Sequence, residues 1–427
     1  MNATLLLLLL LGAFLAINVP IALALGASAV IVGFVLQGNI DFLATILLSS
    51  LQKVELLAIP FFILAGNVLD KCGIMARLFA LVDSLVGRVR GSTGLVASGL
   101  SVMVSGLSGS GPADTAALAV TMGPAMRERG YPKAYSAALV ASGAGLAIVV
   151  PPSIAFILYG VAVPGVSIGD MFVAGVIPGI VMGALIGLAN YIVCVRRNYD
   201  PVGKPFDLAT MLRALRGSVW GIVAPVVIVG GIYLGIVTPT EAAGIAVVYG
   251  LLVGLVIHRE ISFRDLLGII RLTVSDTAAV MLIVACSSVF AWVITIDGTV
   301  VAWVADFAAS ATAHWQVFLM AGIVLLVAGL FLDGASIYLV IIPLLMPAVR
   351  ALGIDLVWFG IFVAIAIGAG QFTPPVGVNL FVASRVLGVS LERVVGETGP
   401  FLLAALAGLV LVYMFPAMST WLPSMMP

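Results

Sequence analysis

The sequence contains an internal repeat: residues 105–160 recur at residues 328–383 without a gap. Twelve of the fifty-six aligned positions are identical, and most of these are glycine or proline. One proline pair, Pro151-Pro152, aligns with a second pair, Pro374-Pro375. Generic apolar sequence would match on leucine, valine and alanine, whereas this repeat matches on residues that interrupt helices. Matched helix breaks in the two halves of an apolar chain point to the ion and substrate sites of secondary transporters.

The composition places the chain in a membrane. Hydrophobic residues make up 63% of it, charged residues 9%, and the mean hydropathy is +1.27. A soluble domain carries about a quarter charged residues. Apolar runs of the ~20 residues that span a bilayer as a helix recur along the chain, and they are too long for barrel strands of about 10 residues. We therefore predict an all-α polytopic protein in a lipid bilayer. With zero net charge and no basic patch, nothing indicates nucleic acid binding.

Two apolar stretches differ from single spans because they are longer and contain central glycines. Arginine and lysine flank both ends of the first stretch, so the positive-inside rule places both ends in the cytoplasm. The stretch should therefore enter and leave on one side as a re-entrant hairpin. The single spans are predicted near residues 3–19, 20–38, 46–69, 134–163, 169–195, 218–236, 240–257, 266–296, 355–386 and 398–424.

These spans divide the chain into two repeats separated by a basic linker. Because five full spans precede the linker, the second copy should be inverted relative to the first. Amphipathic segments at 75–90 and 299–313 precede the two hairpins and are expected at the membrane interface or as short connecting helices. The predicted units are a first inverted repeat at 1–195 (hairpin about 92–126, broken helix about 134–163), a cytoplasmic linker at 196–217, and a second inverted repeat at 218–427 (hairpin about 315–349, broken helix about 355–386).

The tip of the first hairpin, residues 105–112 (SGLSGSGP), is rich in glycine and serine. Carbonyl and hydroxyl oxygens freed at such a break are hard ligands, which suit a monovalent cation better than a transition metal. The alternative is a close helix crossing packed on small residues. The candidate ion ligands at this tip are Ser108, Gly109 and Ser110.

The second tip, residues 332–336 (LDGAS), carries a carboxylate at membrane depth. Such a group is costly in a bilayer, so Asp333 should ligate an ion, cap the returning helix or sit at the outer interface. Asp114, just after the first tip, has the same alternatives. Glu241 follows Thr238-Pro239 and is either a helix cap or a gating residue.

The two proline pairs should unwind the helices that contain them. Each pair removes two N–H donors, and the residue before it avoids helical geometry. The carbonyls upstream then lack partners, and Ser153, Thr373 and Asn379 add side-chain oxygens. A plain kink would need only one proline. Helix N-termini at the breaks carry partial positive charge, which suits an anionic substrate.

Other classes of function find little support in the sequence. The three cysteines are scattered and form no metal motif. No Walker, G-x-S-x-G or HExxH motif is present, so we predict no enzyme and no cofactor.

Several motifs together resemble the large membrane subunit of tripartite ATP-independent periplasmic (TRAP) transporters. The similarity covers nearly the whole chain, and the motifs follow the family's order. They lie at residues 57–67 (LAIPFFILAGN), 109–117 (GSGPADTAA), 151–154 (PPSI), 238–242 (TPTEA) and 373–381 (TPPVGVNLF). The chain departs from the pattern at Cys72, where glycine is common, and at Gly111-Pro112 in the first tip.

The resemblance implies sodium-coupled import of an organic acid anion, such as a C4-dicarboxylate or a sialic acid, by an elevator movement in the bacterial inner membrane. It implies two partners, a small four-helix membrane subunit and a periplasmic substrate-binding protein. The implied sodium ligands are Ser108, Gly109, Ser110, Val149 and Pro151 at one site and Gly334, Thr373 and Gly377 at the other. The implied substrate-binding residues are Ser110, Ser153, Asp333, Ser336, Pro375 and Asn379.

Other hypotheses remain at this stage. A stand-alone divalent-anion/sodium symporter or anion exchanger of a related elevator fold would work without a binding protein. An ion channel would conduct without saturation. An intramembrane enzyme or scaffold would need a buried catalytic group or a polar seam that the repeat does not offer.

Overall fold

The structure, a computed structural model, describes residues 3–86, 89–200 and 207–426, and the side chains of Phe42, Leu107 and Ser108 lie outside the description. All regular elements in these ranges are helical, which confirms the predicted all-α class. The helices are α1 (Ala3–Ala16), α2 (Ile21–Gln37), α3 (Asp41–Leu51), α4 (Ala58–Lys71), α5 (Ile74–Val86), α6 (Ser92–Ser108), α7 (Gly111–Glu128), α8 (Lys133–Ala144), α9 (Ile154–Ala162), α10 (Ile168–Arg197), α11 (Leu208–Tyr233), α12 (Pro239–Leu252), α13 (Phe263–Asp297), α14 (Thr299–Ser310), α15 (His314–Gly329), α16 (Gly334–Ala351), α17 (Leu356–Gly370), α18 (Val378–Leu387), α19 (Leu391–Glu397), α20 (Gly399–Met414) and α21 (Ala417–Thr420). Four short helical turns complete them: η1 (Val54–Leu57), η2 (Gly145–Ile148), η3 (Val253–Ile257) and η4 (Pro423–Met425).

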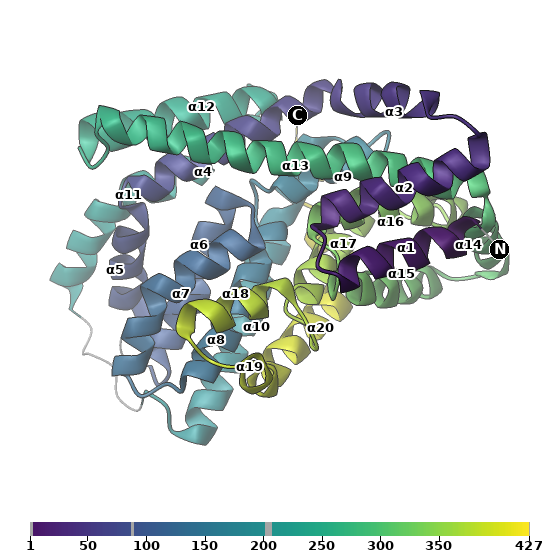
Figure 1. Cartoon of the computed structure of the whole chain (residues 1–427). Coiled ribbons are helices and arrows are strands. Elements are labelled where there is room, and N and C mark those ends of the chain that lie inside the picture. The colour runs from purple at the N-terminus through teal and green to yellow at the C-terminus, as the bar shows by residue number, and fades with distance from the viewer. Residues whose placement is uncertain (1–2, 87–88, 201–206, 427) are drawn as a thin grey trace.

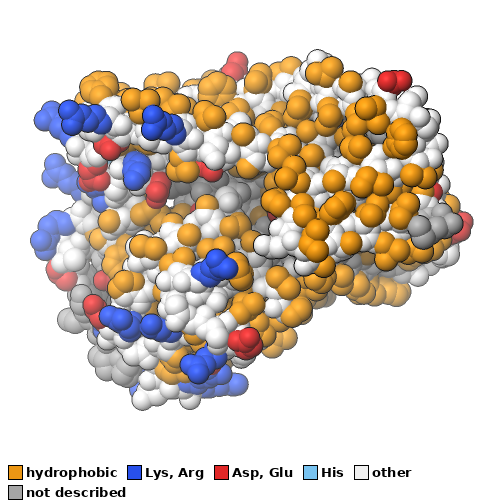
Figure 2. Space-filling model, in the orientation of Figure 1, with side chains coloured by type: hydrophobic (Ala, Val, Ile, Leu, Met, Phe, Trp, Pro, Cys, Tyr) orange, Lys and Arg blue, Asp and Glu red, His pale blue; other side chains and the backbone are white. Residues whose placement is uncertain are grey.

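Many of these helices are apolar enough to lie in a membrane. By length and composition, five helices in the described ranges can each span a bilayer, or up to seven if two bent pairs count as one span each. The remaining predicted spans are shorter apolar helices, because glycine and proline divide them. Large hydrophobic side chains cover much of the surface, as Figure 2 shows on one face.

The helices fall into two groups. In Figure 1 α3, α4, α12 and α13 run along the top, α5 and α11 lie at the left and α1 and α2 at the right, and most of the other helices lie below and between them. We call α1–α5 with α11–α14 the frame, and α6–α10 with α15–α21 the core. Helix α13 has 35 residues, about 50 Å at 1.5 Å per residue. It runs along the frame and packs against α2, α3 and α4. It also contacts α16, so it forms much of the seam between frame and core.

Each half of the core contains a helical hairpin and a broken helix. Helices α6 and α7 form the first hairpin, which turns at Gly109 in the left-handed region (φ 63°). Helices α15 and α16 form the second. The predicted broken helices are α8, η2 and α9 in the first half and α17 and α18 in the second. In both, the chain leaves the helix before a proline pair.

Contacts between the two halves are reciprocal. A Cβ atom placed on Gly145 would lie 2.8 Å from Gly368 O, and one on Gly368 would lie 2.6 Å from Gly145 O. These two glycines are equivalent in the repeat. Gly111 likewise faces Gln371, while its equivalent Gly334 faces Ile148, the equivalent of Gln371. Equivalent residues that meet each other lie on a two-fold axis, so the halves of the core are related by an approximate two-fold rotation.

Both ends of the predicted linker at 196–217 are helical. Helix α10 continues to Arg197, and α11 already begins at Leu208. Asp207 supports this early start, because its carboxylate accepts hydrogen bonds from the backbone N–H groups of Ala209 and Thr210. The Thr210 hydroxyl also donates to it, and these hydrogen bonds lower the pKa of Asp207. The segments expected before the hairpins are the helices α5 and α14.

Candidate functional site

The first hairpin tip packs directly on the first helix break. A Cβ atom on Gly106 would lie 2.8 Å from Pro151 O, so only glycine allows α6 to approach this carbonyl. A Cβ atom on Gly109 would lie 3.1 Å from the backbone nitrogen of Ile154, at the start of α9. The structure therefore brings the predicted ligands Gly109 and Pro151 together. The side chain of Ser108 lies outside the described atoms.

A buried hydroxyl at this tip was missing from the predicted ligand set. Ser105 is fully buried, and its Oγ has no hydrogen-bond partner among the described residues. It lies one turn before Ser108 and next to Gly106. A buried polar atom without a partner is unusual and indicates a ligand, an ion or a water. The S-x-x-S spacing of the tip was the available signal, since residues three apart share a helix face.

The second tip packs on the second break in the same way. A Cβ atom on Gly329 would lie 2.7 Å from the Cα of Gly370, and the reverse distance is 2.9 Å. Thr373 follows this contact and donates its hydroxyl to Ala369 O at 2.8 Å. Gly377 adopts a positive φ of 50°, and a Cβ atom there would lie 3.1 Å from Thr373 O. The predicted ligands Thr373 and Gly377 therefore share one break.

Four of the polar side chains named from the sequence form hydrogen bonds within the chain. Ser153 donates to the carbonyls of Ala147 and Ile148 at 3.0 and 3.1 Å and also caps α9, so it satisfies carbonyls that the proline pair frees. Asp333 caps α16, and the Ser336 hydroxyl donates to its carboxylate. Glu241 forms a capping box with Thr238 at the start of α12. The cap interpretations of Asp333 and Glu241 are therefore the ones that the geometry supports.

The side-chain amide oxygens of Gln371 and Asn379 both lie close to Gly111, at the start of α7. Gln371 and Asn379 are 4% and 0% exposed, and neither side-chain oxygen has a hydrogen-bond partner among the described residues. A Cβ atom on Gly111 would lie 2.2 Å from Gln371 Oε1 and 3.1 Å from Asn379 Oδ1. The amide nitrogen of Asn379 donates to Ala141 O at 3.3 Å, which fixes the orientation of this amide. Gln371 was not among the predicted site residues, because Gly111, which its side chain faces, lies in the other half of the chain.

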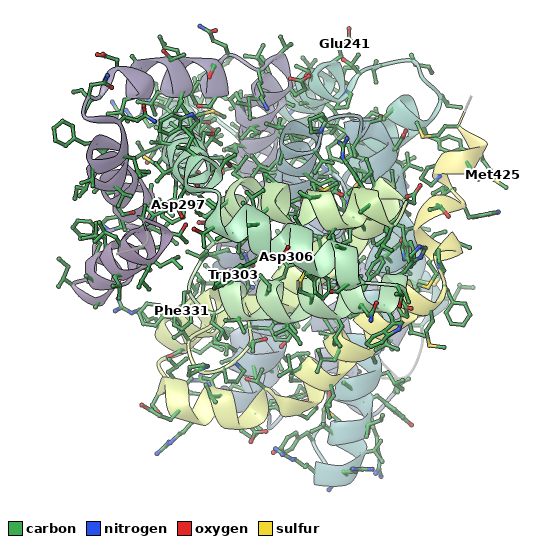
Figure 3. All side chains as sticks on the ribbon, turned by 90° about the vertical axis from the view of Figure 1, so that its right-hand side faces the viewer. Glu241, Asp297, Trp303, Asp306, Phe331 and Met425 are labelled. Atoms are coloured by element: carbon green, nitrogen blue, oxygen red, sulfur yellow. The ribbon has the colours of Figure 1, made fainter. Side chains whose placement is uncertain are left out.

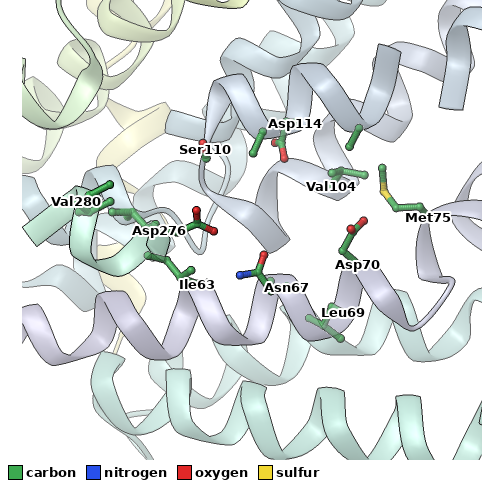
Figure 4. Close-up of a pocket in the computed structure, with 15 residues that line it drawn as sticks. Ile63, Asn67, Leu69, Asp70, Met75, Val104, Ser110, Asp114, Asp276 and Val280 are labelled. Carbon is green, nitrogen blue, oxygen red and sulfur yellow. The ribbon is translucent and has the colours of Figure 1, made fainter. Parts of the chain in front are cut away.

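A cavity of about 340 Å³ opens between the frame and the core beside the first tip. Ser110 and Asp114 of the core face Asn67, Asp70 and Asp276 of the frame across it (Figure 4). None of the described residues that line it is lysine, arginine or histidine. The cavity therefore places a predicted ion and substrate residue, Ser110, on the seam between the two bodies. The predicted substrate residue Pro375 is exposed at the second break.

Two hairpin tips that pack on two broken helices, related by a two-fold axis, define an apolar transporter core. Residues 8–418 match the family described as the DctM component of the tripartite ATP-independent periplasmic transporters. The chain belongs to this family of large transporter permeases. It is therefore a multi-pass membrane protein.

Relatives with known names support this assignment. The C4-dicarboxylate TRAP transporter large permease protein DctM of Rhodobacter capsulatus is 33% identical over 98% of this chain and 98% of its own length. The sialic acid large permease SiaM of Vibrio cholerae is 33% identical over 91% of this chain and 90% of its own. The isethionate permease DctMQ of Oleidesulfovibrio alaskensis is 35% identical over 95% of this chain, which spans 64% of that longer protein.

A solved structure shares the fold. The YdaH transporter of Alcanivorax borkumensis, reported to have an unusual topology, superposes with a TM-score of 0.64 over 99% of this chain and all of its own. Its sequence is 14% identical, so the likeness concerns the fold alone.

Proposed function

We propose that this chain is the sodium-coupled importer subunit for an organic acid anion. The observation that carries the proposal is the paired arrangement of hairpin tip and broken helix, repeated about a two-fold axis. Ser105 with the carbonyls around Pro151 would hold one sodium ion, and Thr373 with its neighbouring carbonyls would hold the second. These are hard oxygen ligands, which suit a cation that sheds its water. The sodium ions and the helix N-termini would together hold the anion.

The distribution of charge supports an orientation in the inner membrane. Lysine and arginine gather at one end of the molecule (Figure 2). Asp297 and Asp306 lie at the opposite end, beside Trp303 and Phe331 (Figure 3). By the positive-inside rule the basic end faces the cytoplasm, and a two-fold axis in the membrane plane would then invert the repeats. The cavity includes Met75 and Asp70, near that basic end, so we infer an inward-facing state.

We infer an elevator movement of the core against the frame. Few described side-chain hydrogen bonds cross the seam between these bodies; one joins Lys53 Nζ to Val161 O at 2.7 Å. Apolar packing with few directional bonds allows two packed bodies to slide at low cost. The predicted units, residues 1–195 and 218–427 around a linker, would each contribute to both bodies.

The names of related permeases support a substrate class and partners for this chain. The names of the relatives cite isethionate, C4-dicarboxylates, sialic acid and 2,3-diketo-L-gulonate, which are all organic acids. We propose that this chain takes such an acid from a periplasmic binding protein and works with a small membrane subunit. A stand-alone symporter of related fold is the alternative, and it would need no binding protein.

Uptake into proteoliposomes tests this proposal. The chain is reconstituted with its proposed small subunit and binding protein, and the acids that the binding protein retains are offered radiolabelled. We expect accumulation only with an inward sodium gradient and only with the binding protein present. Equal uptake without the binding protein would support the stand-alone symporter, and equal uptake in choline would contradict sodium coupling.

A further inference from the structure

A second cavity lies on the same seam, at the other end of α9. It has a volume of about 210 Å³. Helix α9 connects the two cavities, because Ile154 at its start lines the first and Val161 near its end lines the second. Helix α13 also lines both, with Asp276 in the first and Ser288 in the second. The two cavities therefore lie at opposite ends of α9 on the same seam, and we call the stretch of seam from one cavity to the other the path.

The two cavities differ in charge. The first is lined by the carboxyl side chains of Asp70, Asp114 and Asp276, with no cationic residue among its described lining. The second is lined by Lys53, with Ser50 and Ser288 beside it and no aspartate or glutamate among its described lining. An organic anion would therefore be attracted to the end of the path that carries Lys53 and repelled at the end that carries the carboxylates.

The lysine is held by the core in this state. Lys53 belongs to the frame, between α3 and η1, and its Nζ donates to Val161 O at 2.7 Å. Val161 lies in the last turn of α9, where carbonyl groups lack helical partners and attract cations. This bond uses one of the three N–H groups of the ammonium. Movement of the core along the frame would break it.

We propose that Lys53 is the outer anion-receiving site of the path: its ammonium binds the carboxylate or sulfonate of the incoming organic acid. In the inward-facing state the ammonium donates a hydrogen bond to Val161 O instead. A carboxylate or sulfonate is a stronger acceptor than a peptide carbonyl. Arrival of the anion therefore competes for Lys53 and weakens a contact that holds the core against the frame. The site rests on the proposed import of an anion.

Arg350 provides a matched comparison on the same side of the core. Its Nη2 donates to Pro164 O at 2.8 Å, three residues after Val161. Arg350 is therefore a cation that donates a hydrogen bond to a carbonyl just after α9, but it does not line the second cavity. If Lys53 acts only by holding this segment, loss of either cation should have the same consequence. If Lys53 binds the anion, only its loss should affect the charge preference of the cavity.

The test uses cysteine chemistry and needs no knowledge of the substrate. Ser288→Cys is introduced into a chain whose native Cys72, Cys194 and Cys286 are replaced by alanine. The thiol is modified with sulfonatoethyl methanethiosulfonate, an anion, or with its trimethylammonium counterpart, a cation. The ratio of the two rates cancels the reactivity of the thiol itself, because both reagents attack the same thiolate. The ratio is then measured with Lys53, Lys53→Arg, Lys53→Gln and Arg350→Gln.

We expect Lys53→Gln to lower the anion-to-cation rate ratio about tenfold, the size of effect that one nearby unit charge exerts in a partly hydrated site. Lys53→Arg and Arg350→Gln should keep the ratio. Ala279→Cys in the acidic cavity should show the opposite preference, unaffected by Lys53→Gln. An unchanged ratio in Lys53→Gln, or an equal fall in Arg350→Gln, would overturn the anion site.

Uptake kinetics separate this proposal from the proposed function. Lys53→Gln should raise the KM for the acid about tenfold, while the sodium concentration for half-maximal uptake stays the same. Wild-type uptake that needs sodium, with a KM that Lys53→Gln leaves unchanged, would contradict the anion site alone. Wild-type uptake without sodium would contradict the proposed coupling and leave the charge preference of the cavity as a separate result.

Discussion

Gly145→Ala and Gly368→Ala are expected to destabilise the protein more than any alanine placed at an open glycine. The methyl group would lie 2.8 Å from Gly368 O in the first variant and 2.6 Å from Gly145 O in the second. Neither backbone can move without separating the halves of the core. Overpacking of a tight interior typically costs about 1–3 kcal/mol, occasionally more. We expect the upper part of this range, seen as a lower unfolding temperature and loss of monodisperse protein in detergent.

Gly230→Ala and Gly244→Ala are the matched controls. Both glycines are inside helices, α11 and α12, and a Cβ atom there would meet nothing within 4 Å. Alanine favours a helix over glycine by about 1 kcal/mol, so these variants should be as stable as the wild type or more so. If all four variants lost stability equally, the close crossing of the two broken helices would be wrong.

Ser105→Ala and Thr373→Ala are expected to weaken sodium dependence strongly. A hydrogen-bonding or ligand oxygen lost from a charged partner costs about 1.5–3 kcal/mol. Because every 1.4 kcal/mol corresponds to about tenfold, the sodium concentration for half-maximal uptake should rise by about 10- to 100-fold in each variant. Ser105 aligns with Ala328 in the repeat and Thr373 with Val150, so the two variants remove non-equivalent oxygens and each tests its own site. The measurement is initial uptake rate against sodium concentration.

Ser98→Ala is the control for these variants. Ser98 is a buried serine of the same helix as Ser105, but it lies two turns earlier, about 10 Å along the helix, and so away from the break at Pro151. Its loss should leave the sodium dependence unchanged. A similar rise in Ser98→Ala would show that the serines of α6 act through helix packing rather than through an ion.

The hairpins and breaks were predictable from the sequence because glycine and proline constrain the backbone locally. Pro151-Pro152 interrupts a helix wherever it is placed, and the repeat then locates its partner, Pro374-Pro375. That the first tip and the first break lie together was implied only by the family resemblance, which placed Gly109 and Pro151 at one ion site. The identity of each sodium ligand is a prediction that the uptake measurements above address.

The use of individual side chains was less predictable. Ser153 and Asp333 are equally suited to bind a ligand or to cap a helix, and only the folded geometry shows that they cap. Gln371 is polar where its repeat equivalent is Ile148, yet nothing local indicates that it faces Gly111 from the other half of the chain. Contacts between distant segments depend on packing, which a sequence pattern does not specify.

The charged residues on the seam between frame and core could not be grouped from the sequence either. Lys53 and Asp276 are 223 residues apart in the chain, and no motif connects them with Val161 or Asp70. Helices α9 and α13 bring them to the two ends of one path. The linker boundary at Leu208 also depended on a cap, Asp207, whose role is clear only beside the helix that it starts.

The most direct test of the paired ion sites is thermal unfolding of the purified chain in detergent at increasing sodium, with potassium or choline keeping the ionic strength constant. A ligand that binds only the folded state stabilises it by about 2.7 kcal/mol at a hundredfold excess over its Kd. The expected result is a rise of the unfolding temperature that is specific to sodium and continues with its concentration. Identical unfolding temperatures in sodium, potassium and choline would contradict it.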